Sequence, residues 1–228
     1  MPKIFYIIIN RVDECMQMCY NAHVSQDILN GGFMEKQIKS KSRVSDFGEV
    51  YTAKKQVTDM VDLVNESASD INSTVLEPAC GNGNFLVEIL SRKLNVVRRQ
   101  PLDHIKLECD TLRAVASIYG VDIQKDNTEE CRERLYKQVA GTDMGWSPLF
   151  RKVLRDILRR NIMCGDTLTM MADGGKPLTI SEWNIRENGA VVRKDVLFSD
   201  MIANGGESTN YIRRYYYRWM PEEERLTA

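Results

Sequence analysis

Two glycines, Gly81 and Gly83, stand between a short apolar segment and a helical pattern, an arrangement that can bind a ligand. Residues 73–76 become apolar toward their end, and an apolar helical pattern starts at Phe85. Glycines adopt backbone angles closed to other residues and leave no side chain between the backbone and a ligand. A turn that opens a helix presents unpaired N–H groups, which attract an anion or the carboxylate of an amino-acid-like ligand. The third glycine of the dinucleotide fingerprint is absent, so the turn alone also fits plain structural punctuation.

The elements around this turn predict an α/β domain with a parallel-rich sheet flanked by helices. Short apolar segments at 73–76, 117–123 and 161–168 predict strands, and Asp122 and Asp166 stand at the ends of the last two. Helical patterns separate them, at 85–93, from about 98 through 115, at 127–139 and at 149–160. Asn127 and Glu130 have the spacing of a capping box at the start of the third helix.

The two ends of the chain read as additions to this domain. Residues 1–44 predict an N-terminal appendage, with a strand at 3–10, a helix at 12–29 and a solvated linker at 36–43. A helix is expected at 54–65, with Thr52 as a possible cap. Asn188-Gly189 between apolar runs predicts a C-terminal β-hairpin over 176–198. We therefore divide the chain into an appendage (1–44), a domain (45–200) and a basic, aromatic tail (201–228).

Composition narrows the function classes. The chain has 228 residues, 43% of them hydrophobic and 28% charged, with a net charge of −1. This balance gives no overall basic field toward DNA or membranes, so any DNA contact requires a local patch or a partner chain. The basic face of 149–160 fits either solvation or DNA contact. The tyrosines and arginines of 211–219 fit DNA contact, protein contact or a terminal helix packed on its own core.

Cysteines and histidines argue against a metal site. Six cysteines occur without a Cys-x-x-Cys pair, and the chain has two histidines. Scattered cysteines without a secretory signal fit a reducing cytoplasm, and the apolar run 4–9 is too short to span a bilayer. We expect a cytoplasmic protein without metal or membrane attachment.

The residues from Glu77 to Leu86 closely resemble the first cofactor motif of the N6-adenine DNA methyltransferases of restriction–modification systems. That motif has a carboxylate, Pro, Ala, a small residue, Gly, a small polar residue, Gly, and then Asn, Ser or Thr before Phe-Leu. Residues 47–52 resemble the family's Gly-Glu-x-Phe/Tyr-Thr-Pro entry, although Ala53 stands where the proline is usual. Residues 119–124 resemble its acidic-strand motif, and 161–168 resemble its third cofactor motif.

The resemblance implies a Rossmann-like class I fold that binds S-adenosylmethionine. Asp122 would accept hydrogen bonds from the ribose hydroxyls, Ile123 would cover the adenine face, and Asp166 would accept from the exocyclic amine. Taken alone, each of these carboxylates could equally be a cap or turn residue. The implied cofactor-binding residues are Tyr51, Thr52, Glu77, Pro78, Ala79, Cys80, Gly81, Asn82, Gly83, Asn84, Phe85, Asp122, Ile123, Asp166 and Thr167.

The family's catalytic motif, Asn/Asp-Pro-Pro-Tyr/Phe, is missing. No two of the six prolines are adjacent, and the nearest positional analogue, Val196–Met201, contains none. No catalytic residue is therefore assigned, and no target-recognition domain follows. Two interpretations stay open. The chain is the cofactor-binding component of a split or multi-subunit adenine methyltransferase with a protein partner, reaching DNA through the complex. Alternatively, it is a degenerate methyltransferase fold that serves as a binding or regulatory module.

Overall fold

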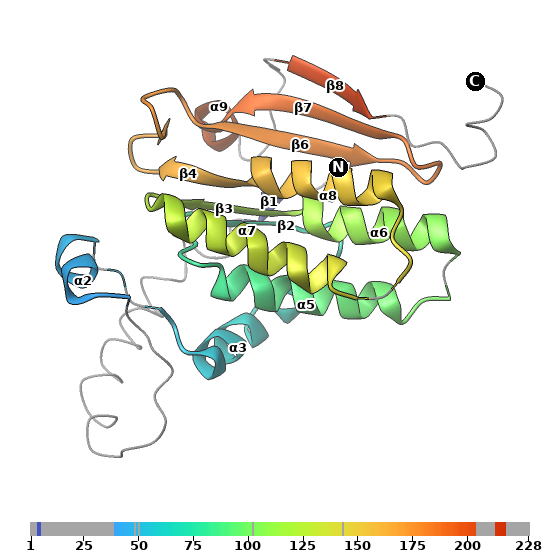
Figure 1. Ribbon diagram of the computed structural model, residues 1–228, viewed down its shortest axis with the longest axis horizontal. Helices are drawn as coiled ribbons and strands as arrows, with labels where there is room; N and C mark the ends of the chain where they lie inside the picture. Colours follow the sequence, from blue (N-terminus) through green and yellow to red (C-terminus); the bar gives the residue numbers. More distant parts are fainter. Residues whose placement is uncertain are drawn as a thin grey trace.

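The described part of the chain folds into two β-sheets with helices packed beside them (Figure 1). The computed structural model describes residues 4–5, 39–47, 49, 51–101, 103–142, 144–203 and 213–217. Its strands are β1 (Ile4–Phe5), β2 (Thr74–Glu77), β3 (Ile118–Asp122), β4 (Ile162–Asp166), β5 (Met171–Ala172), β6 (Thr179–Ile185), β7 (Val191–Leu197) and β8 (Arg213–Tyr217). Its helices are α2 (Lys41–Phe47), α3 (Lys54–Asp62), α4 (Asn65–Ser69), α5 (Asn84–Arg98), α6 (His104–Ala116), α7 (Lys125–Ala140), α8 (Pro148–Asn161) and α9 (Phe198–Ala203).

The first sheet has the order β1-β2-β3-β4-β5. Strands β1 to β4 are parallel, and β5 is antiparallel to β4. Strands β2 and β3 are almost fully buried, as expected when a parallel sheet is covered on both faces. The predicted parallel-rich α/β sheet is thus confirmed, and its arrangement is compatible with a Rossmann-like fold.

Helices α5 to α8 pack on one face of this sheet. Val75, Ile118 and Ile162 contribute to the apolar cluster that these helices share. Gly120 of β3 faces α5, and a Cβ added there would be 2.8 Å from Leu86 Cδ1. A side chain there would therefore push α5 away from β3. The predicted strand and helix boundaries in this layer hold to within a few residues, with two exceptions. Helix α5 continues to Arg98 rather than Lys93, and the helix expected from about 98 starts at His104.

The opposite face carries Leu76, Tyr119, Val121 and Met163, which join a second apolar cluster. Its other buried members come from the end of the chain: Leu178, Ile180, Val196, Phe198 and Met201. The hairpin and α9 therefore contribute to the core of the domain.

The second sheet has the order β6-β7-β8 and is antiparallel. The predicted hairpin is confirmed, with Gly189 in its turn at a φ of 80°. In the tail, a terminal helix was one expected alternative, but the described residues Arg213–Tyr217 form strand β8 instead. The tail thus extends the hairpin into a three-stranded sheet.

Two local expectations differ from the structure, and a third is untested. The predicted helix 54–65 ends at Asp62, and a separate helix starts at Asn65. The linker expected at 36–43 runs into helix α2. The helix expected at 12–29 lies outside the described residues, as does the expected strand 3–10 apart from Ile4–Phe5.

Candidate functional site

Three of the four predicted motifs meet at the carboxyl ends of β2, β3 and β4. Parallel pairing sets Glu77 beside Gly120 and Asp122 beside Cys164. The Gly81 amide donates to Asp122 Oδ2 at 2.8 Å. Thr167 Oγ1 donates to the Pro78 carbonyl at 3.3 Å, which ties the end of β4 to the glycine turn. Residues far apart in the sequence therefore form one site at this edge of the sheet.

The two positions of the turn require glycine for different structural reasons. Both adopt left-handed angles, with φ of 52° at Gly81 and 89° at Gly83. At Gly83 an added Cβ would overlap the Cys131 sulfur, so this glycine lets the turn pack on α7. At Gly81 the added atom would lie 3.4 Å from the Tyr51 ring, on the side of the site. The plain structural interpretation therefore explains Gly83, whereas Gly81 lies within the site.

The expectation of unpaired turn amides is only partly met. Gly81 N–H is bonded to Asp122, and Gly83 N–H donates to the Cys80 carbonyl at 2.8 Å. These two donors therefore serve the fold in this structure. An anionic group would be held by other donors near the turn.

Asp122 is held by three donors. Its Oδ2 accepts from Gly81, and its Oδ1 accepts from the Gln124 amide at 2.8 Å and from Asn127 Nδ2 at 3.2 Å. Because a carboxylate offers about four acceptor positions, one position on Oδ2 stays available to a ligand donor. The bond from the Gln124 amide is the one that an aspartate makes in a turn, so Asp122 has the structural role of a turn residue. It also keeps one acceptor position for a hydrogen bond from a ligand.

Glu77 is a second carboxyl group at this edge. It is 7% exposed and accepts a bond from the Ala79 amide at 3.3 Å. Burial, together with the nearby Asp122 charge, raises the pKa of Glu77 to about 7. Glu77 is therefore divided between its neutral and charged forms near neutral pH.

Apolar and acidic groups at the next strand ends complete this part of the site. Ile123 follows Asp122 and is 57% exposed, an unusual degree for an isoleucine beside a sheet. Asp166 accepts from the Leu168 amide at 2.8 Å and from Thr169 Oγ1 at 3.0 Å, and these bonds hold its pKa below the usual range. Asp166 thus remains a charged acceptor at the end of β4.

A cavity of about 380 Å³ lies on the other side of the glycine turn. Its lining comes from the start of α3, the start of α5 and α7: Tyr51, Thr52, Ala53, Lys54, Val57, Asn82, Asn84, Val87, Glu88 and Arg134. Asp122, Ile123 and Asp166 are not part of this lining. The predicted residues therefore form two neighbouring groups, one on each side of the turn.

Arg134 is the residue of this cavity that sequence reasoning missed. Its Nη1 donates to the Asn82 carbonyl at 2.7 Å and to Asn84 Oδ1 at 2.8 Å. Asn84 Nδ2 donates in turn to the Thr52 carbonyl at 3.0 Å, joining the two predicted motifs. A guanidinium beside a glycine turn suits a carboxylate or phosphate ligand. Arg134 lies in the third turn of α7, far along the chain from the glycine turn, so no local sequence pattern predicts that it reaches the cavity.

The remaining predicted residues are mostly structural. Phe85 packs against the first apolar cluster, and Ala79 is exposed. Cys80 is 7% exposed, and a thiol contact with Cys131, followed by burial, raises its pKa. Cys80 is therefore a neutral thiol below the turn.

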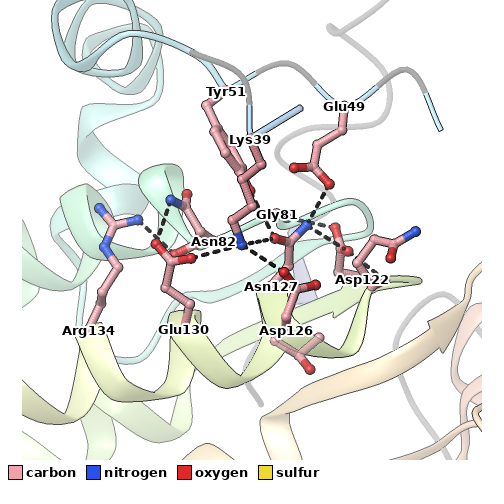
Figure 2. A network of polar contacts seen from close by, with 12 residues as sticks. Lys39, Glu49, Tyr51, Gly81, Asn82, Asp122, Asp126, Asn127, Glu130 and Arg134 are labelled. Atoms are coloured by element: carbon pink, nitrogen blue, oxygen red, sulfur yellow. Dashed lines mark hydrogen bonds and ion pairs between the residues drawn. The ribbon is translucent and has the colours of Figure 1, made fainter. Parts of the chain in front are cut away.

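We define the N-terminal clamp as Lys39, Arg43, Glu49 and Tyr51. Figure 2 shows Lys39, Glu49 and Tyr51 beside the start of α7. Lys39 Nζ lies 3.0 Å from both Asp126 Oδ2 and Glu130 Oε2, and Arg43 makes two bonds to Asp126. The Arg43 guanidinium holds the pKa of Asp126 well below its usual range. Sequence analysis took 36–43 for a solvated linker. The complementary charges of the two segments were the signal that could have revealed the pairing.

Comparisons with known protein families, with characterised proteins and with solved structures found no match. The site must therefore be interpreted from its own residues. Among the described residues, no three His, Cys, Asp or Glu side chains gather as they would around a metal ion. In the same part of the chain, no helix is both long and apolar enough to cross a bilayer.

Proposed function

We propose that this chain is the S-adenosylmethionine-binding component of an adenine-N6 DNA methyltransferase of a restriction–modification or phage-defence system. The observation that carries the proposal is the meeting of the glycine turn, Asp122 and Asp166–Thr167 at one edge of the sheet. Ligands of open α/β sheets bind outside the carboxyl ends of the strands. The cavity beside the turn adds room for a further part of the ligand.

Each side of the turn suits one end of this cofactor. Asp122, with its remaining acceptor position, would bind the ribose hydroxyls, and the exposed Ile123 would cover the adenine. The charged Asp166 would accept from the adenine amine. Arg134 would pair with the carboxylate of the amino-acid end within the cavity. The bound cofactor supplies an electrophilic methyl group, and the residues of this chain bind and orient it.

The transfer step itself requires residues from elsewhere. A flipped adenine must be stacked and its amine held by acceptors during methyl transfer. The nearest analogue of the missing motif, Val196–Met201, lies at the end of β7 and in α9. Strand β7 belongs to the second sheet, so this segment does not follow a strand beside β2, whose described neighbours are β1 and β3. A partner chain would therefore supply the catalytic loop and the reading of DNA.

The missing proline pair also favours a second candidate, a binding or regulatory module without transfer chemistry. This module would use the same cofactor site and differ in its activity with a partner. A DNA methylation assay with the chain alone, and then with the product of the neighbouring gene, separates the two candidates. Activity with the neighbour supports the split enzyme, and inactivity with every neighbour supports the module.

Calorimetric titration with S-adenosylmethionine tests the shared proposal. We expect saturable binding by the parent, and loss of binding by Asp122→Ala. Asp103→Ala is the matched control, because Asp103 also accepts a hydrogen bond from a backbone amide at a helix start. It is the N-cap residue of α6, outside the described site residues. Absence of binding at millimolar cofactor, with Asp122→Ala indistinguishable from the parent, contradicts the proposal.

A further inference from the structure

Asn127 is a buried amide on which the polar network of the site converges (Figure 2). It is 1% exposed. Its Oδ1 accepts from Lys39 Nζ at 2.8 Å, from Tyr51 Oη at 2.9 Å and from Arg43 Nη2 at 3.3 Å. Its Nδ2 donates at 3.2 Å to both Glu49 Oε2 and Asp122 Oδ1. One side chain thus joins the N-terminal clamp to the carboxylate at the end of β3.

The capping role expected for Asn127 is wrong. Helix α7 starts at Lys125 with Gln124 at its N-cap, so Asn127 lies in the first turn of the helix. A buried amide with an incomplete set of partners would destabilise the fold, but here both of its ends are bonded. Its position therefore reflects the clamp and Asp122 rather than the start of the helix.

The donor end of Asn127 fixes the direction of Asp122. With Gly81 and Gln124 it completes a set of three donors, which leaves an acceptor position on Oδ2. The acceptor end fixes the clamp, since three of the four clamp residues donate to Oδ1. Burial, and then the neighbouring Glu49, raises the pKa of Tyr51 to about 12, so Tyr51 remains a hydroxyl donor.

Glu49 shows that the closed clamp still has an unmet acceptor. Its side chain is 9% exposed, and Oε1 is buried with no hydrogen-bond partner among the described residues. A buried carboxylate oxygen without a partner is costly, and a donor on a bound ligand would remove that cost. The clamp therefore carries a second carboxylate toward the network around Asp122.

We propose that Asn127 is the positioning residue of this site. Its amide sets Asp122 and the N-terminal clamp in place together, so that ligand affinity depends on both. The inference rests on the proposed function for the identity of the ligand. The two halves of the amide can be separated experimentally, because N127D keeps the acceptor oxygens and loses the donor.

The test combines calorimetry with S-adenosylmethionine and hydrogen exchange of peptides that contain the clamp residues. For N127D we expect a Kd raised at least about tenfold, because Asp122 loses a donor and gains a like-charged neighbour. Exchange of the peptide that contains Lys39 and Arg43 should stay within about twofold, because both residues keep their acceptor. Glu49 loses the Asn127 donor and gains a like-charged neighbour, so exchange around Glu49 should speed up. N127A should raise Kd by at least about tenfold and also speed clamp exchange at least about tenfold.

Asn161→Ala is the matched control. Asn161 is also a buried asparagine, bonded to the Ala116 and Ile118 carbonyls and to Trp183, away from the site. Its variant should melt at a lower temperature and bind the cofactor within about twofold of the parent.

The inference is overturned if N127D binds like the parent, or if N127A leaves clamp exchange unchanged. It is also overturned if Asn161→Ala loses as much affinity as N127A. A parent that does not bind S-adenosylmethionine contradicts the proposed function instead. Clamp exchange in the ligand-free variants then still decides whether Asn127 fastens the clamp.

Discussion

At the scale of single residues, the buried Glu77 makes stability depend on pH. Burial is the main cause that raises the pKa of Glu77 from 4.5 to about 7. Between pH 4.5 and about pH 7, the folded protein therefore binds more protons than the unfolded chain. The stability that Glu77 contributes is present below this window and is lost as pH rises through 7. The full change is of order 3 kcal/mol.

Glu77→Gln removes this titration and keeps the size of the side chain. We expect the variant to gain stability relative to the parent as pH rises from 5 to 8, by roughly 2–3 kcal/mol. Urea unfolding of both proteins at several pH values measures the difference. Because the other titrating groups are shared, a difference that is constant with pH would show that Glu77 is ionised throughout.

Arg134 belongs to the same scale, because its proposed role concerns one end of one ligand. Arg134→Gln should weaken S-adenosylmethionine binding roughly tenfold to a hundredfold, the value of a charged hydrogen bond. Binding of methylthioadenosine, which lacks the amino-acid end, should change little. Titration of both ligands measures this, with Lys137→Gln on an exposed part of α7 as the control. Equal losses for both ligands would place Arg134 outside the carboxylate subsite.

At the scale of elements, the glycine turn and α7 constrain each other. Gly83→Ala should cost roughly 2–5 kcal/mol, because it combines left-handed strain with overlap of the Cys131 sulfur. Gly81→Ala carries the strain and an ordinary contact with Tyr51, so it should cost roughly 1–2 kcal/mol. Chemical unfolding ranks the two variants. A smaller loss of unfolding free energy for Gly83→Ala than for Gly81→Ala would mean that Cys131 and α7 shift at little cost to make room for the methyl group.

Elements were predictable where their signals are local. The strand ends at Glu77 and Asp122 follow short apolar runs, and Asn188-Gly189 specifies its own turn. Asn127 was misread because a carboxylate three residues on satisfies the capping pattern whichever residue starts the helix. The pairing of Lys39 with Asp126 spans 87 residues, a separation at which periodicity carries no information.

At the scale of the whole molecule, polar side chains join the second sheet both to the helical layer and to the first sheet. Trp183 Nε1 in β6 donates to Asn161 Oδ1 at the end of α8 at 2.8 Å, and Tyr119 Oη in β3 donates to the Ser181 carbonyl at 2.8 Å. Arg193 in β7 is 1% exposed and pairs with Asp195 at 2.9 Å and with Asp156 of α8 at 3.3 Å. These ties predict that both sheets unfold as one unit.

Arg193→Ala tests whether the two sheets unfold together, because it removes the guanidinium that joins β7 to α8. Asp195 would remain buried and lose its nearer cation, keeping the longer contact of 3.9 Å with Arg160. Loss of one member of a buried pair costs about 3–5 kcal/mol. We expect equal falls in the unfolding midpoint reported by Trp183 in the second sheet and by Trp146, which stacks on Phe150 in the helical layer. Variants that retain one of these tryptophans supply the two signals, and Arg186→Ala, at an exposed position of the hairpin, supplies the control. Earlier loss of the Trp183 signal alone would show that the second sheet unfolds independently, since a shared core requires both signals to change together.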